Sequence, residues 1–88
     1  MAYFLYTKSP RIEYPCTWVY KLFGKSQDAI RGAVALIAAG RHYTLKPSRS
    51  SRNNRYHCMN LELRVMSDED RRGLSDALGA HEEILLVL

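Results

Sequence analysis

The chain has 88 residues, of which 47% are hydrophobic and 25% charged, and its formal net charge is +4. This length suits one small domain with helices packed on one sheet, and it argues against a deep, enclosed active site. The composition excludes a disordered or collagen-like chain, and no apolar run approaches the roughly 18 residues that would span a bilayer.

The first predicted elements are an N-terminal extension and a strand. We expect residues 1–13, which contain Pro10, to be loose or to lie along the surface of a single domain at 14–88. Tyr14 to Gly24 is dense in aromatic and β-branched residues, which is typical of a strand. Alternation divides its side chains between a core face and an opposite face, with Trp18, Tyr20 and Leu22 on the first and Thr17, Val19, Lys21 and Phe23 on the second.

A helix is predicted between Ser26 and Gly40. Apolar residues recur there at steps of three and four, which is the period of a helix with one buried side. Ser26 suits the N-cap, and Gly40 lies where a helix end favours a left-handed residue.

A hairpin of two strands follows. His42 to Lys46 predicts a short strand that Pro47 ends, because proline has no N–H to donate to a neighbouring strand. Residues 48–54 are predicted to form a loop, and Tyr56 to Val65 alternates as a third strand. The alternation predicts that Met59, Leu61, Leu63 and Val65 face the core, and that Tyr56, Cys58, Asn60, Glu62 and Arg64 face the other way.

The last part of the chain predicts a second helix and a fourth strand. Ser67 and the three acids after it suit the positive end of a helix dipole, and Gly79 marks the expected end of the helix. Glu83 to Leu88 is expected to form the last strand. The order strand, helix, strand, strand, helix, strand predicts an α+β fold, a ferredoxin-like βαββαβ sandwich in which a four-stranded antiparallel sheet carries both helices on one face.

Three segments together resemble the YbeD-like family of small bacterial proteins, and they are YPCTWVYKLFG, KPSRSSRNNRYHC and ALGAHEEILLVL. The resemblance covers about Tyr14 to Leu88. It implies the same βαββαβ fold, which is usually compared with the ACT regulatory domains, and it supplies no catalytic residues. The positions that match the family are Tyr14, Pro15, Cys16, Lys21, Gly24, Ser48, Ser51 and Tyr56. The turn before Tyr56 departs from the family pattern, since it is longer and has asparagines where the family often has glycine.

The strongest candidate for binding is a basic loop. Residues 41–55 contain five cations and no acid, so the positive charge of the chain is concentrated there. Arginine and serine side chains suit a phosphate or carboxylate, and a small anionic ligand or a charged group of a partner could be held there. A solvated hairpin tip is the simpler explanation of the same charges. The residues proposed for this role are Lys46, Arg49, Ser51, Arg52, Arg55 and Tyr56.

The second candidate is the face of the sheet that the two helices leave open. Apolar side chains are expected on it, and such a patch often marks an interface. We therefore expect self-association or a protein partner, unless the apolar residues 3–6 fold over the same face. The residues assigned to this interface are Val19, Phe23, Leu85 and Val87, beside Tyr56.

An alternative function is nucleic-acid binding through the open face and the basic loop. RNA-recognition domains share this strand order and stack bases on aromatic side chains, for which Phe23 and Tyr56 are the candidates. Against this alternative, the segment RYHCMNLE lacks the glycine and aromatic pattern of those domains, and Glu62 would repel phosphate.

The sequence predicts neither an enzyme nor a metal or cofactor site. His57 and Cys58 are neighbours on a strand and point to opposite faces, so they cannot act as base and nucleophile. The histidines and cysteines lack the paired spacing of metal ligands. Two separate cysteines and the absence of a signal-peptide pattern favour the cytoplasm. We expect a non-catalytic regulatory or protein-interaction module.

Overall fold

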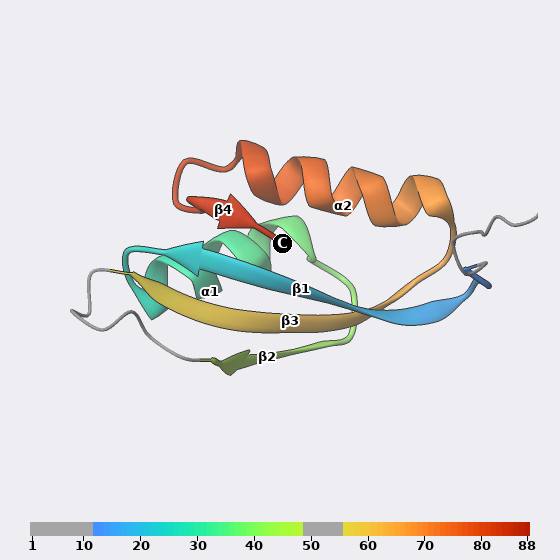
Figure 1. The fold of residues 1–88 in the computed structure, drawn as a ribbon, viewed down its shortest axis with the longest axis horizontal. Helices are drawn as coiled ribbons and strands as arrows, with labels where there is room; N and C mark the ends of the chain where they lie inside the picture. Colours follow the sequence, from blue (N-terminus) through green and yellow to red (C-terminus); the bar gives the residue numbers. More distant parts are fainter. Residues whose placement is uncertain (1–11, 49–55) are drawn as a thin grey trace, which may run out of the picture.

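The computed structural model describes residues 12–48 and 56–88, and it confirms the ferredoxin-like α+β fold. Four antiparallel strands form one sheet in the order β2-β3-β1-β4, and two helices lie against it (Figure 1). Their bounds are β1 Cys16–Gly24, α1 Gln27–Ile37, β2 Tyr43–Pro47, β3 His57–Val65, α2 Asp68–Ala80 and β4 Leu86–Val87.

Both helices begin at the serines that the sequence predicted. The Oγ atom of Ser26 accepts a hydrogen bond from the backbone N–H of Ala29 at 3.0 Å, and the Oγ of Ser67 accepts one from Asp70 at 3.0 Å. Such a cap stabilises a helix by about 1 kcal/mol. Gly40 has φ 83°, as predicted, whereas α2 continues through Gly79 to Ala80.

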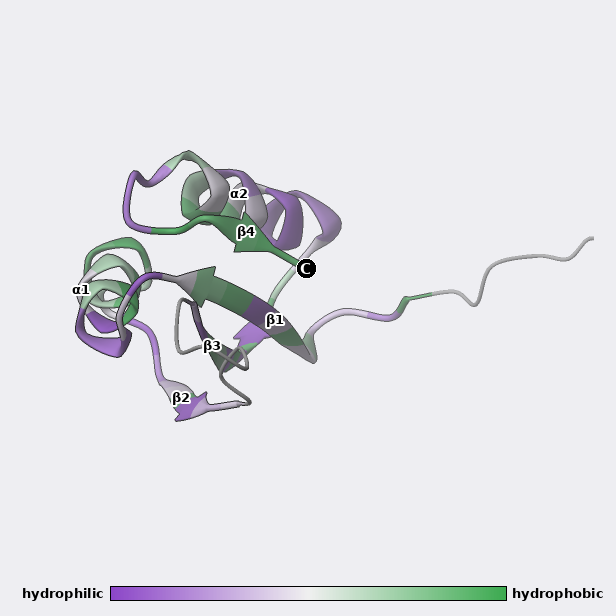
Figure 2. Ribbon diagram, turned by 60° about the vertical axis from the view of Figure 1, so that its left-hand side comes forward, coloured by the Kyte–Doolittle hydropathy of each residue, from purple (hydrophilic) through white to green (hydrophobic). Residues whose placement is uncertain are grey.

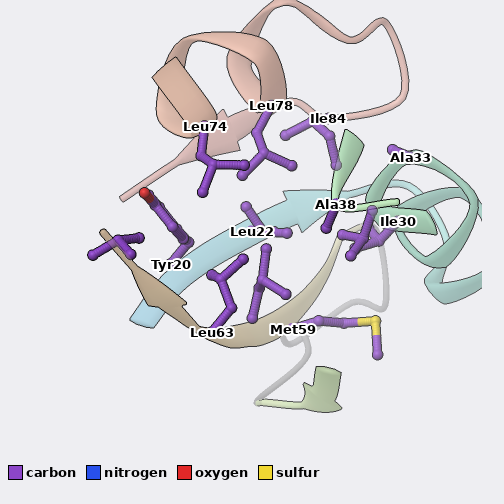
Figure 3. Close-up of a cluster of buried hydrophobic side chains, with 13 residues drawn as sticks. Tyr20, Leu22, Ile30, Ala33, Ala38, Met59, Leu63, Leu74, Leu78 and Ile84 are labelled. Atoms are coloured by element: carbon purple, nitrogen blue, oxygen red, sulfur yellow. The ribbon is translucent and has the colours of Figure 1, made fainter. Parts of the chain in front are cut away.

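The core lies between the helices and one face of the sheet (Figure 3). β1 and β3 pair along nine positions, from Cys16 opposite Val65 to Gly24 opposite His57, and opposed residues share a face. The predicted inward residues of β3 are buried, as are Tyr20 and Leu22 of β1, while Trp18 is half-buried against them. The helices add Ile30, Ala33, Val34, Leu74 and Leu78 to this core. Ala38, the C-cap of α1, and Ile84 of the last loop complete it.

Gly24 allows the end of β1 to approach the rest of the fold closely. A Cβ atom at this position would lie 2.7 Å from Cγ1 of Ile30 and 2.9 Å from the backbone oxygen of Glu83. Both distances are too short for real atoms, so glycine at this point lets α1 and the loop before β4 converge on the strand.

The last strand differs from its prediction in length and in the orientation of one residue. β4 is Leu86–Val87 rather than 83–88, with further backbone hydrogen bonds from Leu85 N–H to Phe23 and between Leu88 and Lys21. Val87 pairs with Leu22 and packs against the core, so its assignment to the open face is wrong. Leu86 pairs with Phe23 and takes that place. Residues 84–88, ILLVL, are all apolar, so their alternation could not fix which of them face inward, and a shift of one residue exchanges the faces.

Several predictions concern residues outside the described ranges. These are the whole of residues 1–11 and, in the basic loop, Arg49, Ser51, Arg52 and Arg55. Within the ranges 12–48 and 56–88, neither helix has the length and apolar character needed to cross a membrane.

Candidate interaction surface on the open face of the sheet

The open face is the side of the sheet that α1 and α2 do not cover. Figure 2 shows both helices on the other side of β1 and β3. The strand register sorts the open face into rows of side chains that run across the strands. Three of these rows form the candidate surface: Cys58, Phe23 and Leu86 in the first, Lys46, Asn60 and Lys21 in the second, and Thr44, Glu62 and Val19 in the third.

One end of the open face is hollowed and apolar. We call this feature the apolar hollow; it has a volume of about 400 Å³ and is lined by Phe23, Tyr56, Leu85 and Leu86. Tyr56 is 47% exposed, Leu85 46% and Leu86 49%. Large apolar side chains that remain half exposed on one concave patch are typical of a contact surface.

The second row places two lysines on either side of an amide, and we call Lys46, Asn60 and Lys21 the lysine row. Adjacent strands lie about 4.8 Å apart, so the two lysine Cα atoms are separated by about 10 Å. Both side chains are exposed, and neither forms an ion pair with another described residue. Oδ1 of Asn60 is buried and has no hydrogen-bond partner among the residues that the structure describes.

The open face is cationic overall in its described part. Arg64 joins the two lysines of the row, and Glu62 is the acid between them on β3. The far rim of the hollow, at Leu85, borders Lys25, Glu82 and Glu83, where the two acids outnumber the cation. Positive charge therefore meets the hollow at the lysine row.

The structure brings together only some of the residues predicted to bind. Lys46 and Tyr56 both lie at the open face, in the lysine row and at the hollow respectively. Val19 is 50% exposed and lies two positions beyond Lys21 from the hollow. Phe23 and Leu85 line the hollow itself, whereas Val87 is turned inward.

Two contributions to the surface were missed by the sequence reasoning. Leu86 belongs to the hollow, and Asn60 forms a row with the two lysines. The alternation of β3 had already placed Asn60 on this face, but only the pairing with β1 and β2 shows which cations flank it.

A second polar cluster lies at the start of α2 and has a different character. Arg71 donates from Nη2 to Oδ1 of Asp68 at 2.7 Å and from Nε to the hydroxyl of Tyr14 at 2.9 Å, and its guanidinium lies 4.7 Å from the ring centre of Trp18. Tyr14 donates in turn to Asp68 at 3.1 Å. The bonds from Arg71 and Tyr14 lower the pKa of Asp68 below its ordinary value, and those to Tyr14 and Asp68 raise the pKa of Arg71.

The same cluster continues to Asp70 and Tyr20. Arg41 binds both carboxylate oxygens of Asp70, and the N–H of Met66 donates to Oδ2 of Asp70 at 3.0 Å, so the pKa of Asp70 falls below its ordinary value. The hydroxyl of Tyr20 donates to the backbone oxygen of Arg71 at 2.6 Å, and burial raises the pKa of Tyr20 to about 12. These groups bind one another and fasten α2 to the sheet.

The cysteines lie apart from each other. Cys16 is half-buried on the core side of β1, and Cys58 is 5% exposed on the open face opposite Phe23, which are the faces that alternation predicted. Across residues 12–48 and 56–88, the structure contains no group of three or more histidine, cysteine or acidic side chains that could hold a metal ion.

Comparisons with known proteins agree with the resemblance found in the sequence. The model of a family described as "Protein of unknown function (DUF493)" matches residues 9–88, and this is the YbeD-like family. An uncharacterized protein of Campylobacter jejuni is 32% identical over 79 residues, which are 90% of this chain and 91% of the relative. An uncharacterized protein of Helicobacter pylori is 22% identical over 82 residues, or 93% of this chain and 95% of the relative.

Solved structures support the fold. A solution structure of a Helicobacter pylori protein has a TM-score of 0.78 at 20% identity, covering 93% of this chain and 90% of that one. A second solution structure from the same organism has a TM-score of 0.64 at 22% identity, covering 93% and 95%. At these identities the likeness concerns the arrangement of the backbone.

Proposed function

Because this chain belongs to the DUF493 family, whose function is unknown, we propose a function from the geometry of its sheet. The chain is a non-catalytic protein-interaction module with a regulatory role, and the open face of its sheet contacts a protein partner. A cytoplasmic location is part of the proposal, because both cysteines are free thiols on opposite faces of the sheet.

The observation that carries this proposal is the cluster of half-exposed apolar side chains around one hollow of the open face. Leu86, Leu85 and Tyr56 are each nearly half exposed around a hollow, whereas Leu22 and Leu61, on the helix side, are fully buried. Covering half of a leucine side chain contributes roughly 1 kcal/mol, so a partner that closes the hollow gains from each of its walls. Lys46, at the edge of the same face, supports the expected contact with an anionic group.

Site-specific photo-crosslinking in living cells tests the proposal. A photoreactive phenylalanine analogue replaces Leu86 on the open face in one variant, and Leu36 in another. Leu36 is a matched control, because it is a leucine of α1 that is 70% exposed on the other side of the domain.

We expect discrete protein crosslinks from position 86 and none of the same mass from position 36. Crosslinks to RNA from position 86 would favour the nucleic-acid alternative. The proposal fails if position 86 yields no protein adduct, or if both positions yield the same adducts.

A further inference from the structure

We propose that the partner's contact segment is an acidic, extended stretch of chain, in which an aspartate or glutamate stands two residues from a large apolar side chain. The apolar side chain fills the hollow, and the carboxylate binds across the lysine row. This inference rests on the proposed function and adds the chemistry of the partner.

The lysine row supplies the charge. Lys21 and Lys46 are exposed, lie about 10 Å apart at their Cα atoms and have flexible side chains long enough to meet above Asn60. Each ammonium has three donors. One donor can satisfy the buried Oδ1 of Asn60, which lacks a partner among the described residues, and the others remain for a carboxylate.

The spacing between the row and the hollow fits an extended chain. Lys21 and Phe23 are two positions apart on β1, so their Cα atoms are about 7 Å apart on one face. An extended peptide spaces its own side chains in the same way, with residues i and i+2 on one side. A segment lying along β1 therefore presents an acid to the row and an apolar side chain to the hollow at once.

Glu62 limits where the acid of the partner segment can bind. It lies on the open face in the row beyond the lysine row, away from the hollow, and would repel a second carboxylate there. The partner's acid is thus confined to the lysine row. A segment that continues past it needs a neutral or cationic side chain opposite Glu62.

Charge argues against two other occupants. A second copy would bring the cations Lys21, Lys46 and Arg64 against the same set, with one acid on each described face. The chain's own residues 1–11 contain Lys8 and Arg11 and no acid, so they lack the carboxylate that the row would bind.

Peptide display against the full chain tests the inference. A random library of twelve-residue peptides is selected on the wild type, on Lys21→Glu and on Arg31→Glu. The last is a matched control, because it makes the same change in net charge on α1, where Arg31 pairs with Asp28 at 3.5 Å in an exposed contact worth little. Circular dichroism checks that each variant is folded.

We expect the wild type and Arg31→Glu to enrich the pattern of an acid two residues from Leu, Phe, Trp or Met. Lys21→Glu should lose this enrichment. A synthetic peptide with the enriched pattern should bind about tenfold more weakly to Lys21→Glu than to Arg31→Glu, and more weakly as salt rises. Leu86→Glu should also weaken it, because the hollow would then carry a charge.

Other outcomes overturn the inference. Peptides without acid enrichment, enrichment that is unchanged in Lys21→Glu, or no selected peptide would each exclude the acidic segment. Binding of RNA or a self-dimer that Lys21→Glu abolishes would assign the row to that occupant instead. Protein crosslinks from position 86 together with any of these results would leave the proposed function standing, whereas the absence of those crosslinks removes the function itself.

Discussion

The two faces of the sheet treat charge in opposite ways. On the helix side, Arg41 and Arg71 are bound to Asp70 and Asp68, and their contacts join α2 to β1 and to the segment before β2. On the open face, Lys21 and Lys46 have no acidic partner among the described residues, and they lie beside half-exposed apolar side chains. Paired charges on the helix side stabilise the fold, and no ligand is needed to explain them. Unpaired lysines beside an apolar hollow are better explained by a ligand that binds them.

The largest expected effect is on the free energy of unfolding, which should fall much more when a buried leucine is truncated than when a half-exposed one is. Leu61→Ala should lower the free energy of unfolding by about 2 to 5 kcal/mol, because Leu61 is fully buried and its loss leaves a cavity. Leu86→Ala should cost only about 1 kcal/mol, because Leu86 is 49% exposed and only the covered half of its side chain contributes to stability. Urea denaturation measures both values. Equal losses of stability at Leu61 and Leu86 would mean that another part of the chain covers the open face. The two faces would then not differ in burial.

The difference between the faces was largely predictable along β1 and β3. Strict alternation in YHCMNLELRV placed Leu61 and Leu63 inward and Asn60 and Glu62 outward, and the structure confirms each of these faces. Alternation depends only on neighbours along one strand, so a single sequence contains it. It failed at Val87, where every residue of the strand is apolar.

The candidate site was less predictable, because it depends on register between strands. The lysine row needs Lys46 opposite Asn60 and Asn60 opposite Lys21, and pairing between residues far apart in sequence is not written in either strand alone. The cluster at the start of α2 was missed for the same reason. Its acids suit a helix N-terminus locally, and nothing near them in sequence points to Arg41 or Tyr14.

The next prediction concerns the buried hydroxyl of Tyr20, on the helix side of the sheet. Burial raises the pKa of Tyr20 to about 12, from an ordinary value of 10.0. The folded state therefore keeps this proton at a pH where the unfolded state loses it, so stability is present below pH 10 and is lost as the pH rises toward 12. Urea denaturation of the wild type should show an alkaline loss of roughly 2 kcal/mol that Tyr20→Phe lacks.

Two further comparisons test whether Tyr20 causes this alkaline loss of stability. Tyr20→Phe should also cost about 1 kcal/mol at neutral pH, since it removes the 2.6 Å hydrogen bond to Arg71. Tyr56→Phe, at a hydroxyl-bearing residue of the open face that is 47% exposed, keeps Tyr20 and should retain the alkaline loss. If Tyr20→Phe and the wild type lose stability in parallel between pH 10 and 12, Tyr20 does not carry the effect.

The smallest expected effect on stability concerns the hydrogen-bonded carboxylate of Asp70, on the helix side of the sheet. Asp70 accepts from Arg41 and from the N–H of Met66, and these bonds hold its pKa below the ordinary 3.8. A lowered pKa contributes stability above about pH 4, and this contribution is lost as the pH falls through the folded pKa. Asp70→Asn should therefore cost about 1 kcal/mol at pH 7, and the gap to the wild type should narrow on acidification.

The matched control for Asp70 is Asp28→Asn, which removes the same charge from an α1 side chain that is 98% exposed and 3.5 Å from Arg31. It should change stability at pH 7 by less than about 0.5 kcal/mol, because exposed ion pairs contribute little. Denaturation at pH 7 and at pH 3 measures both variants. A cost at Asp70 no larger than that at Asp28 would show that the paired charges of the helix side do not fasten α2 to the sheet. In that case, whether a charge is paired would no longer distinguish the charges that stabilise the fold from the charges that bind a ligand.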